Sequence, residues 1–104
     1  MRLMSERIED VFKQLFQNEK VEPGDYRIYT RSSGLPQRYF VFLVWDGFDD
    51  MSVTARAKWI VERLHNLVPD VEFREHISQV VMQSSKEFEG VDELVQRAYA
   101  DRLC

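Results

Sequence analysis

His76 is the residue of this sequence with the clearest capacity for chemistry, because an imidazole nitrogen can bind a transition metal. One histidine is not a complete metal site, so further ligands would have to come from elsewhere. His65 falls within a helical pattern, where we expect it at the surface, and Cys104 is the last residue. The residues leave two interpretations of His76 open. It is either a ligand in a site that a second molecule completes, or a histidine that forms a hydrogen bond at a sheet edge.

Six basic residues form a second candidate site, at which phosphate groups could bind. Between Tyr26 and Arg38 the local charge is +3 with no acidic residue, and the helix that follows carries +2 after Glu62 is counted. If the two segments share a face, Tyr29 and Tyr39 would add stacking surface for single-stranded bases. The alternative is an ordinary solvated surface, which is favoured by the net charge of −4 and the absence of a Gly-x-x-Gly clamp. The six residues are Arg27, Arg31, Arg38, Arg56, Lys58 and Arg63.

Acidic and hydroxyl side chains in the sequence do not form a catalytic set. Asp46, Asp49 and Asp50 lack the spacing of a Ca²⁺ loop and are typical of a charged turn before a helix. The segment Ser32-Ser33-Gly34 lacks the Gly-x-Ser-x-Gly turn that presents a serine nucleophile. Neither a phosphate-binding glycine loop nor a dinucleotide fingerprint is present. The sequence therefore predicts a protein that is not an enzyme.

Length and composition indicate one globular domain that spans residues 1–104. Of the residues, 44% are hydrophobic and 31% are charged, which is ordinary for a folded protein. No segment approaches the roughly 20 apolar residues of a membrane helix, so we expect no membrane contact. A single cysteine excludes an intramolecular disulfide bond, which favours a cytoplasmic location.

Periodic patterns predict three helices and three strands in the order α-β-β-α-β-α. Apolar residues at helical spacing follow Ser5 and Ser52, which are both suitable N-caps. Ser84, with Glu87 three residues later, is a capping-box signature for the last helix. Alternating residues followed by an unbroken apolar run indicate two strands of an antiparallel hairpin, the second covered on both faces or nearly so. The predicted helices cover residues 5–18, 53–67 and 84 onward, and the predicted strands cover residues 25–31, 38–45 and 77–82.

Each of these helices has an apolar stripe that should face the sheet. In the helix over residues 5–18 the stripe consists of Ile8, Val11, Phe12, Leu15 and Phe16. In the helix over residues 53–67 the stripe consists of Val53, Ala57, Ile60, Val61, Leu64 and Leu67. In the last helix it consists of Val91, Leu94, Val95, Ala98 and Leu103. The sequence therefore predicts an α+β fold, in which a small three-stranded sheet has helices packed on one face.

Three segments, distributed between residues 5 and 90, resemble the BolA-like family. They are SERIEDVFKQLF, YFVFLVWDGFDDMSVTARAK and HISQVVMQSSKEFEG. In the family, a histidine opens the last strand twelve residues before an aromatic residue, and His76 and Phe88 keep this spacing. The basic triplet of the family's second helix reads Arg56-Ala57-Lys58 here, with alanine in place of histidine, and Ser84-Ser85 stands where the family has Thr-Pro.

This resemblance implies a class II KH-like fold and a non-enzymatic role beside a monothiol glutaredoxin. Members of the family share a [2Fe-2S] cluster with that partner and bind none alone, which implies that His76 is the iron ligand of this chain. Some members bind DNA, so the resemblance also implies that the surface around Arg56 and Lys58 contacts the partner or nucleic acid. Two alternatives stay open. One is a KH-like nucleic-acid-binding module without metal, and the other is a protein-protein adaptor or homodimer that pairs through its sheet edge.

Overall fold

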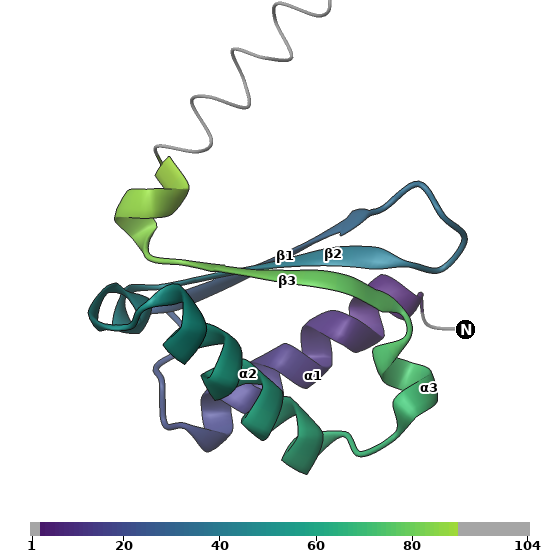
Figure 1. The fold of residues 1–104 in the computed structure, drawn as a ribbon, viewed down its shortest axis with the longest axis horizontal. Coiled ribbons are helices and arrows are strands. Elements are labelled where there is room, and N and C mark those ends of the chain that lie inside the picture. Colours follow the sequence, from purple (N-terminus) through teal and green to yellow (C-terminus); the bar gives the residue numbers. More distant parts are fainter. Residues whose placement is uncertain (1–2, 90–104) are drawn as a thin grey trace, which may run out of the picture.

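The computed structural model describes residues 3–89, which form a three-stranded sheet with helices on one face (Figure 1). This is the α+β architecture that the sequence predicts, and the main elements follow in the predicted order. They are α1 (Met4–Asn18), β1 (Tyr26–Ser32), β2 (Tyr39–Trp45), η1 (Asp46–Asp50), α2 (Val53–Leu67), α3 (Val71–Arg74) and β3 (Ile77–Gln83). A further helical turn begins at Ser85 and continues to residue 89. The predicted stripe of the last helix, from Val91 to Leu103, lies outside the described residues, as does Cys104.

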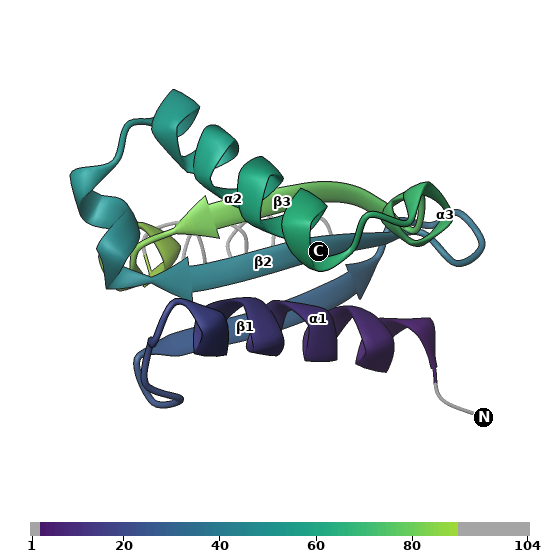
Figure 2. The ribbon, with the colours of Figure 1, turned by 90° about the horizontal axis from the view of Figure 1, so that it is seen from below.

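The sheet has the strand order β1-β2-β3, so β2 lies at its centre. β1 and β2 form the predicted antiparallel hairpin, in which Tyr26 lies opposite Trp45. β3 runs parallel to β2, with Val80 opposite Val41. A parallel neighbour requires a crossover connection, which α2 provides. Figure 2 shows that α1 lies across β1 and α2 lies beside β3, and Figure 1 places both helices on the same face of the sheet.

The core lies between this face of the sheet and the helices α1 and α2. Alternate residues of β2 enter the core, since Val41 and Leu43 are fully buried. Where β2 ends, the Trp45 ring centre lies 5.1 Å from that of Phe48 and 5.4 Å from that of Trp59. These rings join the end of the sheet to η1 and α2. The buried cluster consists of Ile8, Phe12, Leu15, Phe16, Val41, Leu43, Phe48, Trp59, Ile60, Leu64 and Phe73.

Two of the three predicted helix caps are confirmed. The Ser52 hydroxyl accepts a hydrogen bond from the Ala55 backbone N–H at the start of α2. The Glu87 carboxylate accepts a hydrogen bond from the Ser84 N–H, and the Ser84 hydroxyl accepts one from the Glu87 N–H, which together form the capping box. The prediction for Ser5 is wrong, because α1 already begins one residue before it.

α2 covers the predicted residues, but it is rotated relative to the predicted orientation. Three members of the predicted apolar stripe are exposed, namely Val53, Ala57 and Val61. Arg56 and Trp59 occupy the buried side of the helix instead. A hydrophobicity pattern assigns every arginine to the surface, and it fails here because the charge of Arg56 is paired inside the protein.

Two short helices, η1 and α3, are not predicted by the sequence pattern. They contain 5 and 4 residues, which is less than the length over which a helical period can be recognised. α3 begins after Asp70, whose carboxylate accepts a hydrogen bond from the Glu72 N–H. It buries Phe73 and leads directly into β3. Among the helices within residues 3–89, none is long and apolar enough to cross a membrane.

Candidate functional site

The connection between β1 and β2 folds onto the start of β3. The Ser33 N–H donates to the Arg38 carbonyl over 3.0 Å, which closes the hairpin. The Tyr39 N–H donates to the His76 carbonyl over 2.8 Å, which joins the end of the connection to the residue before β3. Gln37 lies between them with a φ of 54°, in the left-handed region that few residues other than glycine adopt. The hairpin connection therefore ends beside His76.

A hydrogen bond to this connection fixes the His76 ring. The Nδ1 atom lies 2.7 Å from the carbonyl oxygen of Gln37. A carbonyl only accepts hydrogen bonds, so Nδ1 carries the hydrogen, and in the neutral ring the lone pair is on Nε2. Histidines that bind metals commonly have this arrangement, in which the nitrogen that does not bind the metal donates to a carbonyl or a carboxylate. Nε2 of His76 is thus suited to bind a metal.

An open recess of about 300 Å³ lies beside the ring, and His76 is partly exposed there. The recess is lined by Pro36, Gln37, Arg38, Glu75 and His76. Within residues 3–89, no three histidine, cysteine, aspartate or glutamate side chains are grouped so that they could hold a metal ion. His65 is exposed on α2 and does not line the recess. The recess offers the His76 imidazole and the Glu75 carboxylate, which are too few to hold a metal ion, so a metal bound here would need ligands from a second molecule.

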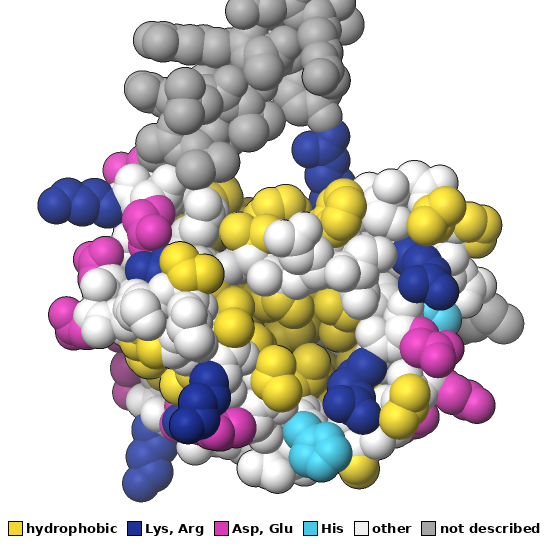
Figure 3. All heavy atoms as spheres, in the orientation of Figure 1, with side chains coloured by type: hydrophobic (Ala, Val, Ile, Leu, Met, Phe, Trp, Pro, Cys, Tyr) yellow, Lys and Arg dark blue, Asp and Glu magenta, His cyan; other side chains and the backbone are white. Residues whose placement is uncertain are grey.

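The basic residues selected from the sequence do not form one surface. Arg27 and Arg31 lie on the sheet face opposite α1 and α2, as the alternation of β1 requires. Arg38 lines the His76 recess. Lys58 and Arg63 lie on α2, which covers the other face of the sheet. Figure 3 shows Lys and Arg side chains scattered over the visible side of the molecule, with acidic side chains between them.

The two basic residues of α2 outside the core have acidic neighbours. Lys58 is well exposed, and its Nζ lies 4.0 Å from the carboxylate of Glu62. Arg63 pairs with Glu19 at the end of α1, and its guanidinium carbon lies 4.5 Å from the centre of the Trp59 ring. Arg63 therefore helps to join α1 to α2, and neither cation extends the basic surface of the hairpin.

Arg56, which the sequence predicts on the exposed basic surface, is only 8% exposed. Its Nε donates to the carbonyls of Phe48 and Met51 over 3.0 and 3.1 Å. Its Nη1 donates to the carbonyl of Met82 over 3.0 Å, and its Nη2 lies 2.8 Å from a carboxylate oxygen of Glu87. The guanidinium joins η1, β3 and the last helical turn. Arg56 is therefore a structural residue, and burial removes it from any phosphate-binding surface.

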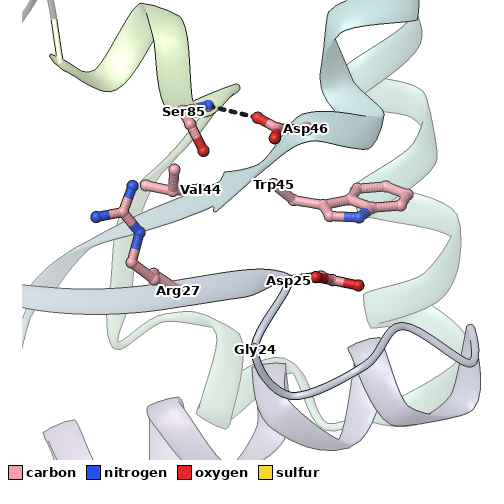
Figure 4. A pocket seen from close by; sticks show the side chains of 7 residues that line it. All are labelled: Gly24, Asp25, Arg27, Val44, Trp45, Asp46 and Ser85. Atoms are coloured by element: carbon pink, nitrogen blue, oxygen red, sulfur yellow. Dashed lines mark hydrogen bonds between the residues drawn. The ribbon is translucent and has the colours of Figure 1, made fainter.

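A second recess, of about 280 Å³, lies where β1 and β2 meet the last helical turn (Figure 4). The Asp46 carboxylate accepts a hydrogen bond from the Ser85 backbone N–H over 2.9 Å. This bond, with a further one from the Ser85 side chain, lowers the pKa of Asp46. Arg27 and Asp25 border the same recess from the start of β1. Asp46 thus acts as the helix-terminal carboxylate that the sequence predicts, although at the last helix and not at α2.

The sheet face opposite α1 and α2 carries two aromatic residues that sequence reasoning missed, Phe40 and Phe42. Phe40 and Phe42 alternate with the core residues of β2, so they lie on this face. Tyr29 lies opposite Phe42 and stacks on Phe88, with ring centres 5.5 Å apart. Tyr39, which the sequence groups with Tyr29, packs against the core instead. The period of two in β2 is the signal for this arrangement, but it is hard to see because both faces of the strand are apolar.

Comparisons of the chain with protein-family models, with curated proteins and with solved structures found no match. Membership of the BolA-like family therefore stays a prediction from the sequence resemblance, and the geometry described above bears only on the candidate site itself.

Proposed function

We propose that this chain is a non-enzymatic BolA-like protein that presents His76 to a [2Fe-2S] cluster shared with a monothiol glutaredoxin. The partner and the cluster are taken from the resemblance to the BolA-like family. The observation that supports the ligand role of His76 is the hydrogen bond from its Nδ1 to the Gln37 carbonyl, because this bond keeps the lone pair on Nε2. The ring is partly exposed in an open recess, so a second protein can approach it. The glutaredoxin would supply its cysteine thiolate, and glutathione would supply another.

The residues of the recess fit a shared cluster better than a metal ion held by this chain alone. They include one imidazole and the Glu75 carboxylate, which are too few for a metal ion, so we expect the partner to supply the remaining ligands. A cluster bound by thiolates carries negative charge, and the recess is lined by one cation, Arg38, and by one carboxylate, that of Glu75. Substitution of an imidazole for a thiolate raises the reduction potential of an iron–sulfur cluster. We expect no cluster on the isolated chain.

Reconstitution with a monothiol glutaredoxin, glutathione, iron and sulfide tests this proposal through the visible absorption spectrum. The wild-type complex is expected to have bands that differ from those of the glutaredoxin alone, and His76→Ala is expected to remove that difference. His76→Cys should retain a cluster but lower its reduction potential. His65→Ala is the matched control, because it deletes the other histidine of the chain, which is exposed on α2. Identical spectra for the wild type and His76→Ala would show that the ligand assignment is wrong.

A second candidate function, the binding of single-stranded nucleic acid, is supported by the charge of the sheet face opposite α1 and α2. The three strands contain no acidic residue, and Arg27 and Arg31 lie on either side of Tyr29 on this face. Aromatic side chains and cations of this kind bind single strands by stacking and by phosphate contacts. This candidate does not use Arg56, because that residue is buried.

Fluorescence anisotropy with a labelled single-stranded oligonucleotide, measured at low and high salt, tests the second candidate. Arg31→Glu is expected to weaken binding, whereas Lys58→Glu, on the opposite side of the sheet, should leave it unchanged. Binding should also fall steeply as salt increases, because phosphate contacts release counterions. Binding that is absent, or that does not respond to salt, would exclude this function.

A further inference from the structure

The two edges of the sheet differ in how well they are protected. β3 is an edge strand, and within residues 3–89 it has a hydrogen-bonded neighbour on one side only. Its sequence, ISQVVMQ, contains no charged residue and no proline. Charges and prolines protect strand edges, because an unprotected edge pairs with other strands. The opposite edge strand, β1, carries Arg27 and Arg31. β3 is therefore the edge that is suited to pair with another chain.

α2 presents an exposed apolar stripe beside this edge. We call it the outer stripe, and it consists of Val53, Ala57 and Val61. These residues are four positions apart, so they lie on one side of the helix. The other flank of α2 faces α1, since Trp59 contacts Phe16 and Arg63 pairs with Glu19. Figure 2 shows that α1 lies across β1 and that α2 lies beside β3. The outer stripe is on the flank of α2 opposite Trp59 and Arg63, so it faces away from α1.

The surface between β3 and α2 is also apolar. Figure 3 shows hydrophobic side chains gathered in a hollow that is bordered by β3, α2 and α3. Val80 and Met82 of β3, and Leu67 at the end of α2, pack against the core but are only partly buried. An open strand edge beside an apolar surface is typical of sites at which a further strand is added to a sheet.

We propose that a second copy of this chain pairs with β3, antiparallel and about a two-fold axis. The sheets of the two copies would become continuous, and the outer stripes of the two α2 helices would pack against each other. A two-fold axis places identical surfaces opposite each other, so a charged side chain on the edge of one copy would lie near the same charge of the other copy and would be repelled. β3 has no charge and the outer stripe is entirely apolar, which favours a second copy over a charged partner.

Light scattering of the full chain during size-exclusion chromatography, over a series of protein concentrations, tests this proposal. The wild type is expected to form a dimer as the concentration rises. Val61→Glu is expected to raise the dissociation constant at least about tenfold, because two like charges would face each other across the axis. Leu35→Glu is the matched control, since Leu35 in the hairpin connection is 60% exposed and Val61 is 61% exposed. The control should dimerise as the wild type does.

Two outcomes would overturn the proposal. One is a wild-type chain that stays monomeric at every concentration, and the other is a dimer that Val61→Glu and Leu35→Glu weaken equally. Circular dichroism shows whether each variant is folded. If Val61→Glu does not fold, hydrogen exchange of the wild type decides the question. The β3 amides should then be better protected at high protein concentration than at low, and equal protection would reject the β3 interface.

Discussion

The buried guanidinium of Arg56 donates hydrogen bonds to backbone and carboxylate oxygens from three parts of the chain. Two of its acceptors are the carbonyls of Phe48 and Met51, and the others are the carbonyl of Met82 and the carboxylate of Glu87. Removal of the guanidinium would take a donor away from each of these oxygens in a partly buried setting, although the Phe48 carbonyl would keep the Met51 N–H and the Glu87 carboxylate would keep the Ser84 N–H. Such a loss costs more than the loss of an exposed ion pair.

Arg56→Ala is therefore expected to lower the free energy of unfolding by about 3 kcal/mol. Urea denaturation, followed by the fluorescence of Trp45 and Trp59, measures this change. Lys58→Ala is the control, because Lys58 is exposed two residues along the same helix, and it should change stability by less than about 0.5 kcal/mol. Equal effects of the two substitutions would contradict the structural role of Arg56.

Glu87 makes the stability of the same network depend on pH. The hydrogen bond from Arg56, and after it that from the Ser84 N–H, lowers the pKa of Glu87 from its ordinary value of 4.5 to about 2. The folded-state pKa lies below the unfolded one, so ionised Glu87 stabilises the fold above about pH 4.5, and this contribution is lost as the pH falls toward 2. The Glu87 side chain is 43% exposed, so solvent reduces the size of the effect.

Glu87→Gln is expected to be less stable than the wild type at neutral pH, and the difference should shrink as the pH falls from 4.5 toward 2. Thermal unfolding of both proteins over this range measures the difference. Glu89→Gln is the control, because Glu89 is an exposed carboxylate two residues away. A difference between wild type and Glu87→Gln that stays constant with pH would show that the carboxylate is not stabilised by Arg56.

At the scale of elements, Ser52 caps a helix and Ser5 does not, so their substitutions should differ in effect. Ser52→Ala should lower the free energy of unfolding by about 1 kcal/mol, because it removes the acceptor for the Ala55 N–H at the start of α2. Ser5→Ala should have little effect, because Ser5 does not cap α1. Urea denaturation of the two variants tests the pair, and a larger loss from Ser5→Ala would contradict the observed start of α1.

The junction of β2 and η1 requires a glycine at position 47. A Cβ atom there would lie 2.3 Å from the Trp45 ring, and the Phe48 and Trp59 rings contact that ring as well. Gly47→Ala should therefore cost about 2 kcal/mol of stability, as overpacking does in other proteins, and should alter the tryptophan fluorescence of the folded state. Gly24→Ala is the control, since its Cβ would meet no atom within 4 Å. Equal stability of both variants would mean that the Trp45 ring moves freely.

Helices and strands whose bounds depend on caps and on the pattern of neighbouring residues could be predicted from the sequence. Contacts between residues far apart in the chain could not. α2 has the predicted bounds because Ser52 and the residues that follow determine them. Its orientation depends on the pairing of Arg56 with Glu87, which is 31 residues away.

The candidate site likewise depends on a contact between distant residues that the sequence does not reveal. The sequence selects His76 by its type and by the family resemblance, but Gln37, which fixes the ring, lies 39 residues away and contributes only a backbone carbonyl.

At the scale of the whole molecule, the His76 recess and the outer stripe of α2 belong to different elements. The recess is built from the hairpin connection and the residues before β3, and the stripe lies on α2. His76 directly precedes β3, which is part of the proposed dimer interface, but its ring is hydrogen-bonded to the hairpin connection through the Gln37 carbonyl. We therefore expect His76→Ala to leave dimer formation unchanged and Val61→Glu to leave the spectrum of the reconstituted complex unchanged. Light scattering and visible absorption measure the two effects. If either substitution affects both readouts, the glutaredoxin and the second copy compete for one surface.

The parallel pairing of β2 with β3 also determines the order in which the protein can assemble. Tyr39 of β2 lies opposite Ile77 of β3, whereas β1 reaches β2 through a short connection. Contacts between residues far apart in the chain form slowly, so we expect the hairpin to form early and β3 to join last. Val41→Ala should then slow refolding, and Val80→Ala should mainly accelerate unfolding. A strand that arrives last spends the longest time unpaired during biosynthesis, so newly made chains would be most prone to mispairing at β3.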